Sequence, residues 1–127
     1  MARPAAKELT DRELEIMHVF WHRQEATAQE VRDALAAAGN DLAYTTVATL
    51  VRILCDKGFL KAVNEERPFR YQPTRPYKEV SRRLLDDLVE KVFHGSRKQL
   101  LQHLVEEKPL KAKERAILEK LMEELEP

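Results

Sequence analysis

Apolar residues recur with helical spacing in three stretches of the N-terminal half. The first two stretches begin with capping boxes, Thr10 with Glu13 and Thr27 with Glu30, in which a hydroxyl and a carboxylate satisfy amides of the first turn. The third stretch lacks a capping side chain, but its apolar positions repeat at i, i+3, i+4 and i+7 and are Val47, Leu50, Val51 and Leu54. We predict helices from about Thr10 to His22, Thr27 to Ala38 and Tyr44 to Lys57, the last two ended by Gly39 and Gly58.

After the third helix the pattern becomes that of a β-hairpin. Residues 59–64 and 69–72 favour strands, and the Glu-Glu-Arg-Pro segment at 65–68 favours the turn between them. Pro68 falls where a missing amide does little harm. A further short strand is expected at residues 25–27, between the first two helices.

The rest of the chain has a helical pattern throughout. Apolar residues recur every four positions at Val80, Leu84, Leu88 and Val92, and Gly95 ends this helix. Ser96 and Gln99 form another capping box, and Pro109 separates the last two helices. The fold class is therefore mainly α. We expect three helices and a hairpin at residues 1–74, a winged helix-turn-helix, followed by a three-helix region at 75–127.

Composition and charge limit the partners that this chain can have. Of its 127 residues, 43% are hydrophobic, 22 are basic and 22 are acidic. Neither half is basic, so a surface that binds phosphates has to be a local patch. No apolar run approaches the roughly 18 residues of a membrane span, and the N-terminus lacks an apolar signal-peptide core. The single cysteine, Cys55, cannot form an internal disulfide. We expect a cytoplasmic protein without membrane insertion.

The helix at 44–57 has the residue pattern that DNA reading requires. Such a helix buries one face and presents small polar or basic side chains on the other, because bulky apolar groups would block entry to the major groove. The candidate DNA-binding residues on the helix are Thr45, Thr46, Ala48, Thr49 and Arg52, and those on the hairpin are Lys61, Arg67 and Arg70. The hairpin residues suit phosphate or minor-groove contacts.

Two other interpretations fit the same pattern. A helix with polar residues opposite an apolar stripe is also what any surface helix shows, and winged helices also serve as protein-interaction modules. The balanced net charge favours such an adaptor without specific DNA binding. Binding to duplex DNA that depends on salt concentration separates these alternatives.

The residues of this region resemble the penicillinase-repressor family, which includes penicillinase and methicillin-resistance repressors and copper-responsive relatives. The resemblance centres on AYTTVATLVRIL at residues 43–54 and DKGFL at 56–60, and it extends from Leu9 to Leu125, including Trp21, Tyr71 and Pro73. It implies a repressor that binds a palindromic operator as a dimer. It also implies that Thr45, Thr46, Ala48, Thr49 and Arg52 face the DNA. Ile53 stands where better-known members have arginine, so the operator sequence does not transfer directly.

The resemblance bears differently on two modes of regulation. Penicillinase-type repressors are inactivated by cleavage of an Asn-Phe bond, but the matching positions here are His103 and Leu104. The resemblance therefore does not predict that switch, or the membrane sensor or protease partner that it would need. Copper-responsive relatives end in a cysteine-rich motif, whereas this chain has no cysteine after Cys55.

The leucine stripes of the C-terminal helices predict a dimer interface. A complete winged-helix domain leaves little surface for three more amphipathic helices to cover, so their apolar faces are expected to pack against a second copy. The candidate dimerisation residues are Leu84, Leu88, Val92, Leu101, Leu104, Leu118 and Leu121.

The sequence contains few signs of other chemistry. It has no phosphate-binding loop, nucleophile elbow or zinc-protease motif, so we expect neither an enzyme nor a cofactor. His18 and His22 have the i, i+4 spacing that can chelate a metal ion, and a metal-sensing repressor is the remaining alternative. No neighbouring cysteine or carboxylate pair completes such a site, and a surface role is the simpler interpretation.

Overall fold

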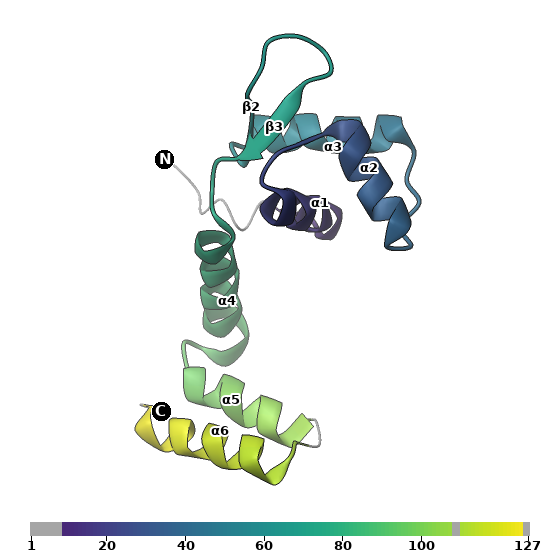
Figure 1. Ribbon diagram of the computed structural model, residues 1–127. Helices are drawn as coiled ribbons and strands as arrows, with labels where there is room; N and C mark the ends of the chain where they lie inside the picture. The colour runs from purple at the N-terminus through teal and green to yellow at the C-terminus, as the bar shows by residue number, and fades with distance from the viewer. Residues whose placement is uncertain (1–8, 108–109, 126–127) are drawn as a thin grey trace. The chain divides into compact units, whose positions relative to one another are not determined.

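The computed structural model describes residues 9–107 and 110–125. The chain forms α1 (Asp11–Arg23), β1 (Ala26–Thr27), α2 (Ala28–Ala37), α3 (Tyr44–Asp56), β2 (Leu60–Ala62), β3 (Arg70–Pro73), α4 (Tyr77–Phe93), α5 (Arg97–Glu107) and α6 (Ala112–Glu124) (Figure 1). The predicted order of helices and strands is confirmed, including the short strand before α2. Pro109, the predicted break between the last two helices, lies outside the described residues.

Both predicted capping boxes at the starts of α1 and α2 are present. The Glu13 amide donates to Thr10 Oγ1 at 3.2 Å, and the Thr10 amide donates to Glu13 Oε1 at 3.0 Å. The corresponding distances between Thr27 and Glu30 are 3.1 and 2.9 Å. These reciprocal bonds satisfy amides that a helix start otherwise leaves without partners. Ala43, the residue before α3, provides no side-chain cap, as its sequence indicates.

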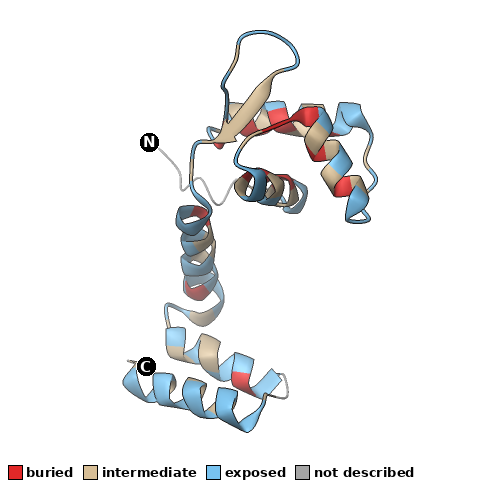
Figure 2. Cartoon of the chain, viewed as in Figure 1, coloured by how far each residue is buried: buried red, intermediate tan, exposed pale blue. Residues whose placement is uncertain are grey.

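The hydrophobic core lies among α1, α2, α3 and a small antiparallel sheet. The strands are ordered β1-β3-β2, with Thr27 opposite Arg70 and Lys61 opposite Gln72. Buried positions concentrate in this part of the chain (Figure 2). The largest fully buried side chains are Phe20, Phe59, Ile16, Met17, Leu54, Val31, Val47 and Val51. Three helices and a hairpin around one core form the predicted winged helix-turn-helix.

The chain divides into two compact units, Met1–Arg83 and Leu84–Pro127. The first unit includes the start of α4 because aromatic contacts attach this segment to α1. Trp21 Nε1 donates to the Arg75 carbonyl at 2.8 Å, and the rings of Trp21 and Tyr77 pack edge to face with centroids 5.3 Å apart. The start of α4 thus belongs to the first unit. The boundary that we predict between residues 74 and 75 falls just before this segment.

The second unit is mostly exposed. α5 and α6 contact each other, yet no described residue of α6 is buried, and Figure 2 shows this helix as largely exposed. His103 and Leu104 lie within α5, where the helix has to unwind before a protease can reach the bond between them. In the described part of the chain, no helix is both long enough and apolar enough to cross a membrane.

Candidate nucleic-acid interface

The outer face of α3 has the geometry expected of a DNA-reading helix. Val47, Val51 and Leu54 are fully or almost fully buried, which fixes the orientation of the helix in the first unit. Four of the five candidate residues, Thr45, Thr46, Thr49 and Arg52, are exposed, and Ala48 between them is half-buried. Arg52 makes no hydrogen bond or ion pair with other residues of the described chain. Its guanidinium is therefore available to a ligand outside the protein.

The wing, which comprises β2, β3 and the loop between them, presents two further candidates, Lys61 and Arg67, on its exposed surface. The side chain of Asn64 closes its loop. Asn64 Nδ2 donates to the carbonyls of Glu66 and Pro68 at 3.0 and 3.1 Å, and Asn64 Oδ1 accepts from the Arg70 amide at 2.8 Å. The Arg67 guanidinium lies 5.8 Å from the centre of the Phe69 ring, as in a cation–π contact. The hydrogen bonds of Asn64 hold the wing loop, and the contact with Phe69 holds the Arg67 guanidinium within it.

A groove of about 740 Å³ separates α3 from the wing. It is lined by Thr27, Ala28, Gln29, Tyr44, Ala48, Arg52, Cys55, Arg67, Pro68, Phe69 and Tyr71. Burial, with a smaller contribution from Asp56, raises the pKa of the Cys55 thiol, which keeps it protonated at neutral pH. Cys55 is half-buried at the edge of α3. Two cations line this groove, Arg52 from α3 and Arg67 from the wing, so both lie on one face of the first unit.

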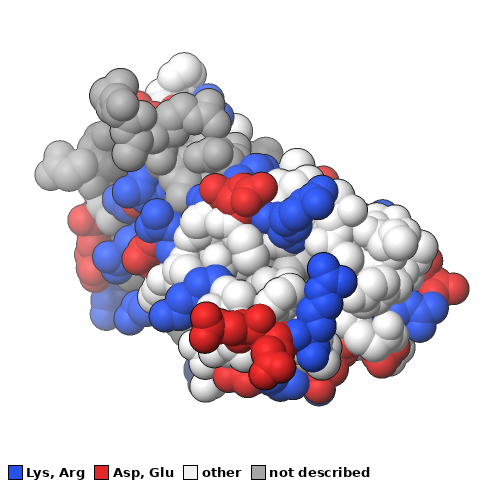
Figure 3. All heavy atoms as spheres, turned by 90° about the horizontal axis from the view of Figure 1, so that it is seen from above, with Lys and Arg blue, Asp and Glu red and all other residues white. Residues whose placement is uncertain are grey.

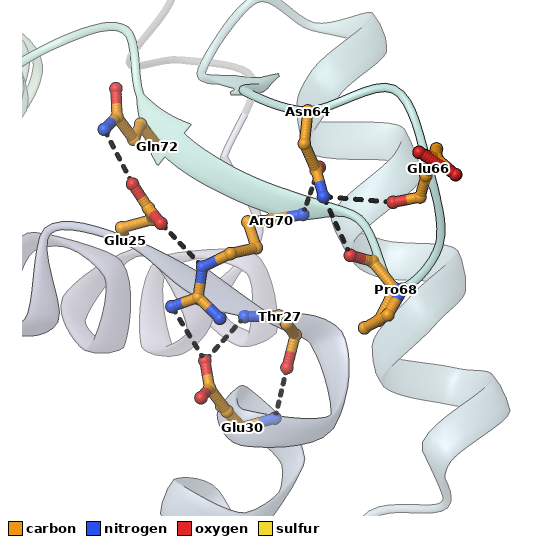
Figure 4. Close-up of polar contacts among 8 residues, drawn as sticks. All are labelled: Glu25, Thr27, Glu30, Asn64, Glu66, Pro68, Arg70 and Gln72. Atoms are coloured by element: carbon orange, nitrogen blue, oxygen red, sulfur yellow. Dashed lines mark hydrogen bonds and ion pairs between the residues drawn. The ribbon is translucent and has the colours of Figure 1, made fainter.

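Arg70 differs from the other candidates because it has protein partners. Its Nε lies 2.6 Å from Glu25 Oε2, and its second guanidinium nitrogen lies 3.4 Å from Glu30 Oε1 (Figure 4). Gln72 Nε2 donates to the other oxygen of Glu25 at 3.0 Å. The hydrogen bond from Arg70, followed by that from Gln72, lowers the pKa of Glu25. We name Glu25, Glu30, Arg70 and Gln72 the wing-base network.

Sequence reasoning did not identify Glu25 and Gln72 as part of this site. Arg70 and Glu25 are 45 positions apart, and only the pairing of β1 with β3 brings them together. The signal in the sequence was the short strand at 25–27, whose strand partner was not predicted.

On the face of the molecule seen in Figure 3, the charged side chains of the described residues are distributed rather than gathered in one basic patch. Seen from above, Lys and Arg side chains border a broad uncharged surface, and several acidic side chains cluster along part of its edge (Figure 3). This pattern agrees with the equal numbers of basic and acidic residues in the chain. Attraction for DNA would therefore depend on the local placement of a few cations.

The two histidines of α1 do not form part of a larger cluster of metal ligands. Among residues 9–107 and 110–125, no group of three or more His, Cys, Asp or Glu side chains is arranged to hold a metal ion. The ring of His18 packs instead against Trp21 and Tyr77, with centroid separations of 5.5 and 5.9 Å. This contact supports a structural role for His18.

Comparison with known proteins gives consistent matches over most of the chain. The family model described as "Penicillinase repressor" matches residues 9–124. Transcriptional regulator BlaI of Mycobacterium tuberculosis is 37% identical over 100 residues, which cover 77% of this chain and 72% of the relative. Methicillin resistance regulatory protein MecI of Staphylococcus aureus is 23% identical over 103 residues, covering 81% of this chain and 83% of that protein.

A solved structure also matches much of the chain. The solution structure of the DNA binding domain of the repressor BlaI aligns with 62% of this chain and 93% of its own length. The TM-score is 0.52 and the sequence identity is 28%. The similarity thus includes the winged helix-turn-helix, in which α3 and the wing present the candidate residues.

Proposed function

Because the chain belongs to the penicillinase repressor family, we propose that it is a transcriptional repressor that binds a palindromic operator as a homodimer. The observation that carries this proposal is the outer face of α3, where three exposed threonines and Arg52, which has no partner among the described residues, lie opposite the buried side chains of Val47, Val51 and Leu54. A regulator of this kind acts where its DNA lies, so we place its action in the cytoplasm. Its family consists of transcriptional regulators, and no catalytic step is proposed.

We infer that α3 enters the major groove. Threonine side chains are short enough to approach base edges, where they contact thymine methyl groups or phosphates, and an arginine can donate two hydrogen bonds to guanine. Thr45, Thr46, Ala48, Thr49 and Arg52 form this proposed reading surface. Lys61 and Arg67 would contact the backbone beside it, because both project from the wing that flanks the groove next to α3.

Exposed apolar side chains support the proposed dimer interface. Leu88, Val92, Leu104 and Leu121 are between 43% and 57% exposed in the single chain, although each is a large hydrophobic residue. Leu84, Leu101 and Leu118 are half-buried beside them. Monomeric proteins rarely leave so many large apolar groups in water, so a second copy of the same surface is the proposed cover.

Dimerisation would also supply the specificity that one reading helix lacks. A single helix contacts only a few base pairs, whereas two helices related by a two-fold axis read two half-sites about one helical turn, roughly 34 Å, apart. Each half-site adds its own discrimination against mismatched bases. A palindromic operator follows from the symmetry of such a dimer.

Selection of duplexes from a random DNA pool by the purified protein, followed by sequencing, tests this proposal. We expect enrichment of a palindrome whose half-sites are about 10 base pairs apart, centre to centre. Enrichment of no motif, with only weak retention that disappears as salt is raised, would contradict it. That result would favour the protein-interaction adaptor.

Replacing Thr49 by alanine is expected to weaken binding to the selected operator by about 5- to 10-fold, with little change for random DNA. Thr49 is exposed on the reading face, and alanine has the higher helix propensity, so the loss cannot arise from a weakened helix. Fluorescence anisotropy with both duplexes measures the two affinities. The Thr49→Val variant keeps a methyl group but lacks the hydroxyl. It therefore separates a contact of the methyl group with thymine from a hydrogen bond of the hydroxyl. An equal loss for both duplexes would place Thr49 on the DNA backbone instead.

A further inference from the structure

Arg70 connects the wing to the corner between α1 and α2, residues 24–27. Its backbone pairs across the sheet with Thr27, and its side chain reaches Glu25 and Glu30 on either side of that residue (Figure 4). Gln72, two positions along the same strand, holds the other oxygen of Glu25. Both the main chain and the side chains of β3 are therefore attached to the segment from which α2 begins.

The same residue is attached to the loop of the wing. The Arg70 amide donates to Asn64 Oδ1 at 2.8 Å, and its carbonyl accepts from the Val63 amide at 2.8 Å. The Asn64 side chain in turn holds the loop carbonyls of Glu66 and Pro68. A change in the position of Arg70 would therefore move the wing loop, including Arg67, relative to α2 and to α3, against which α2 packs.

The charges around Arg70 also disfavour binding of a DNA phosphate to its guanidinium. Hydrogen bonds lower the pKa of both Glu25 and Glu30, so both are ionised at neutral pH. Arg23 also acts on Glu30, so two cations balance two carboxylates and the cluster has no excess positive charge to attract a phosphate. A DNA phosphate that approached Arg70 would have to displace bonds that are already made.

We propose that Glu25 and Arg70 are positioning residues for DNA binding, which hold the wing at its working distance from α3, and that Arg70 is not a phosphate ligand. This inference rests on the proposed DNA-binding function. It assigns Arg70 a role different from the one expected for a basic residue on a wing. It also gives a role in DNA binding to an acidic residue, Glu25, that has the same sign of charge as DNA.

The variants Glu25→Gln and Arg70→Gln test the proposal because the two possible roles predict effects of opposite sign for Glu25. General electrostatics predicts that removing a carboxylate near DNA strengthens binding. If Glu25 positions the wing, Glu25→Gln weakens operator binding by about 5-fold, Arg70→Gln does the same, and the double variant is no weaker than Arg70→Gln alone. Glu65→Gln is the matched control, since this exposed wing residue lies outside the network, and it is expected to bind equally well or better.

The salt dependence of the same affinities separates positioning from phosphate binding. A phosphate ligand present twice in a dimer contributes about 1.8 to the slope of log affinity against log salt concentration. We expect Arg67→Gln to reduce the slope by about this amount and Arg70→Gln to leave it unchanged. Stronger operator binding by Glu25→Gln, or a slope reduced by about 1.8 in Arg70→Gln, would overturn the proposal.

A measurement without DNA distinguishes failure of this inference from failure of the proposed function. Backbone ¹⁵N relaxation of residues 64–67 and 69 reports the order of the wing loop directly. We expect lower order parameters in Glu25→Gln and Arg70→Gln, but not in Glu65→Gln, while amide spectra of α1 to α3 stay native. Unchanged loop order in Glu25→Gln would overturn the positioning role. Failure of the wild-type protein to select any operator would instead remove the proposed function.

Discussion

Replacing Leu88 or Leu121 by aspartate is expected to convert the proposed dimer into monomers and to lower operator affinity by at least about 100-fold. Both side chains are more than 40% exposed in the single chain and belong to the proposed interface. In a two-fold symmetric interface each substitution appears twice, so two carboxylates would have to be buried without partners. A monomer then loses the second half-site and the high effective concentration at which it is held.

Sedimentation velocity gives the oligomeric state, and anisotropy with the selected operator gives the affinity. Gln99→Asp is the matched control, because it adds the same charge to the first turn of α5, where a carboxylate favours the helix. We expect this control to stay dimeric. Dimers retained by both leucine variants would show that another surface joins the two copies, and the assignment of the apolar stripe would have to be abandoned.

Local signals in the sequence predicted most of the secondary structure. A capping box needs only residues three positions apart, so Thr10 with Glu13 and Thr27 with Glu30 were identifiable without knowledge of the fold. The glycine after α2 and the glycine after α3 both adopt the positive φ expected of helix ends, 96° and 87°. The fold class and the family followed from these elements and from the string of residues in α3.

Contacts between distant segments could not be predicted in the same way. The pairing of Arg70 with Glu25 depends on the register of β1 and β3, which is set by only two residue pairs and leaves no periodic pattern. Similarly, the change from a hairpin pattern to a helical pattern favoured a boundary near residue 74, whereas the contact of Tyr77 with Trp21 attaches the start of α4 to the first unit. Whether an apolar stripe faces its own chain or a second copy is also independent of its periodicity.

Glu13 illustrates how a residue predicted for one local role gained a second one from the tertiary structure. Its side chain is almost fully buried, and its Oε1 accepts from Lys57 Nζ at 2.8 Å as well as from the Thr10 amide. Burial by itself would raise the pKa of Glu13, but the hydrogen bonds from Lys57 and Thr10 outweigh it and lower the pKa below the ordinary value of 4.5. The ion pair thus connects the start of α1 to the residue that follows α3.

We expect Glu13→Gln to reduce the free energy of unfolding at pH 7 by about 2 kcal/mol, because the amide keeps the cap but removes the charge that pairs with Lys57. Since the folded pKa is lowered, this stabilisation is fully present above about pH 4.5 and is lost as the pH falls through the folded pKa. The difference between wild type and variant should therefore shrink in acid. Urea unfolding at fixed protein concentration, at pH 7 and then at decreasing pH, measures it.

Glu15→Gln, the same substitution two positions along α1, is the control for this prediction. Glu15 forms a partly exposed pair with Arg12 and accepts a hydrogen bond from Asn40 Nδ2 at 3.1 Å, which the amide oxygen of glutamine can also accept. Loss of the charge alone should therefore change stability by less than about 0.5 kcal/mol. Equal losses in the two variants would show that the Glu13–Lys57 pair contributes no more than a surface pair. A difference between Glu13→Gln and wild type that grew in acid would contradict the lowered pKa, because only a carboxylate more acidic in the folded protein loses its advantage on protonation.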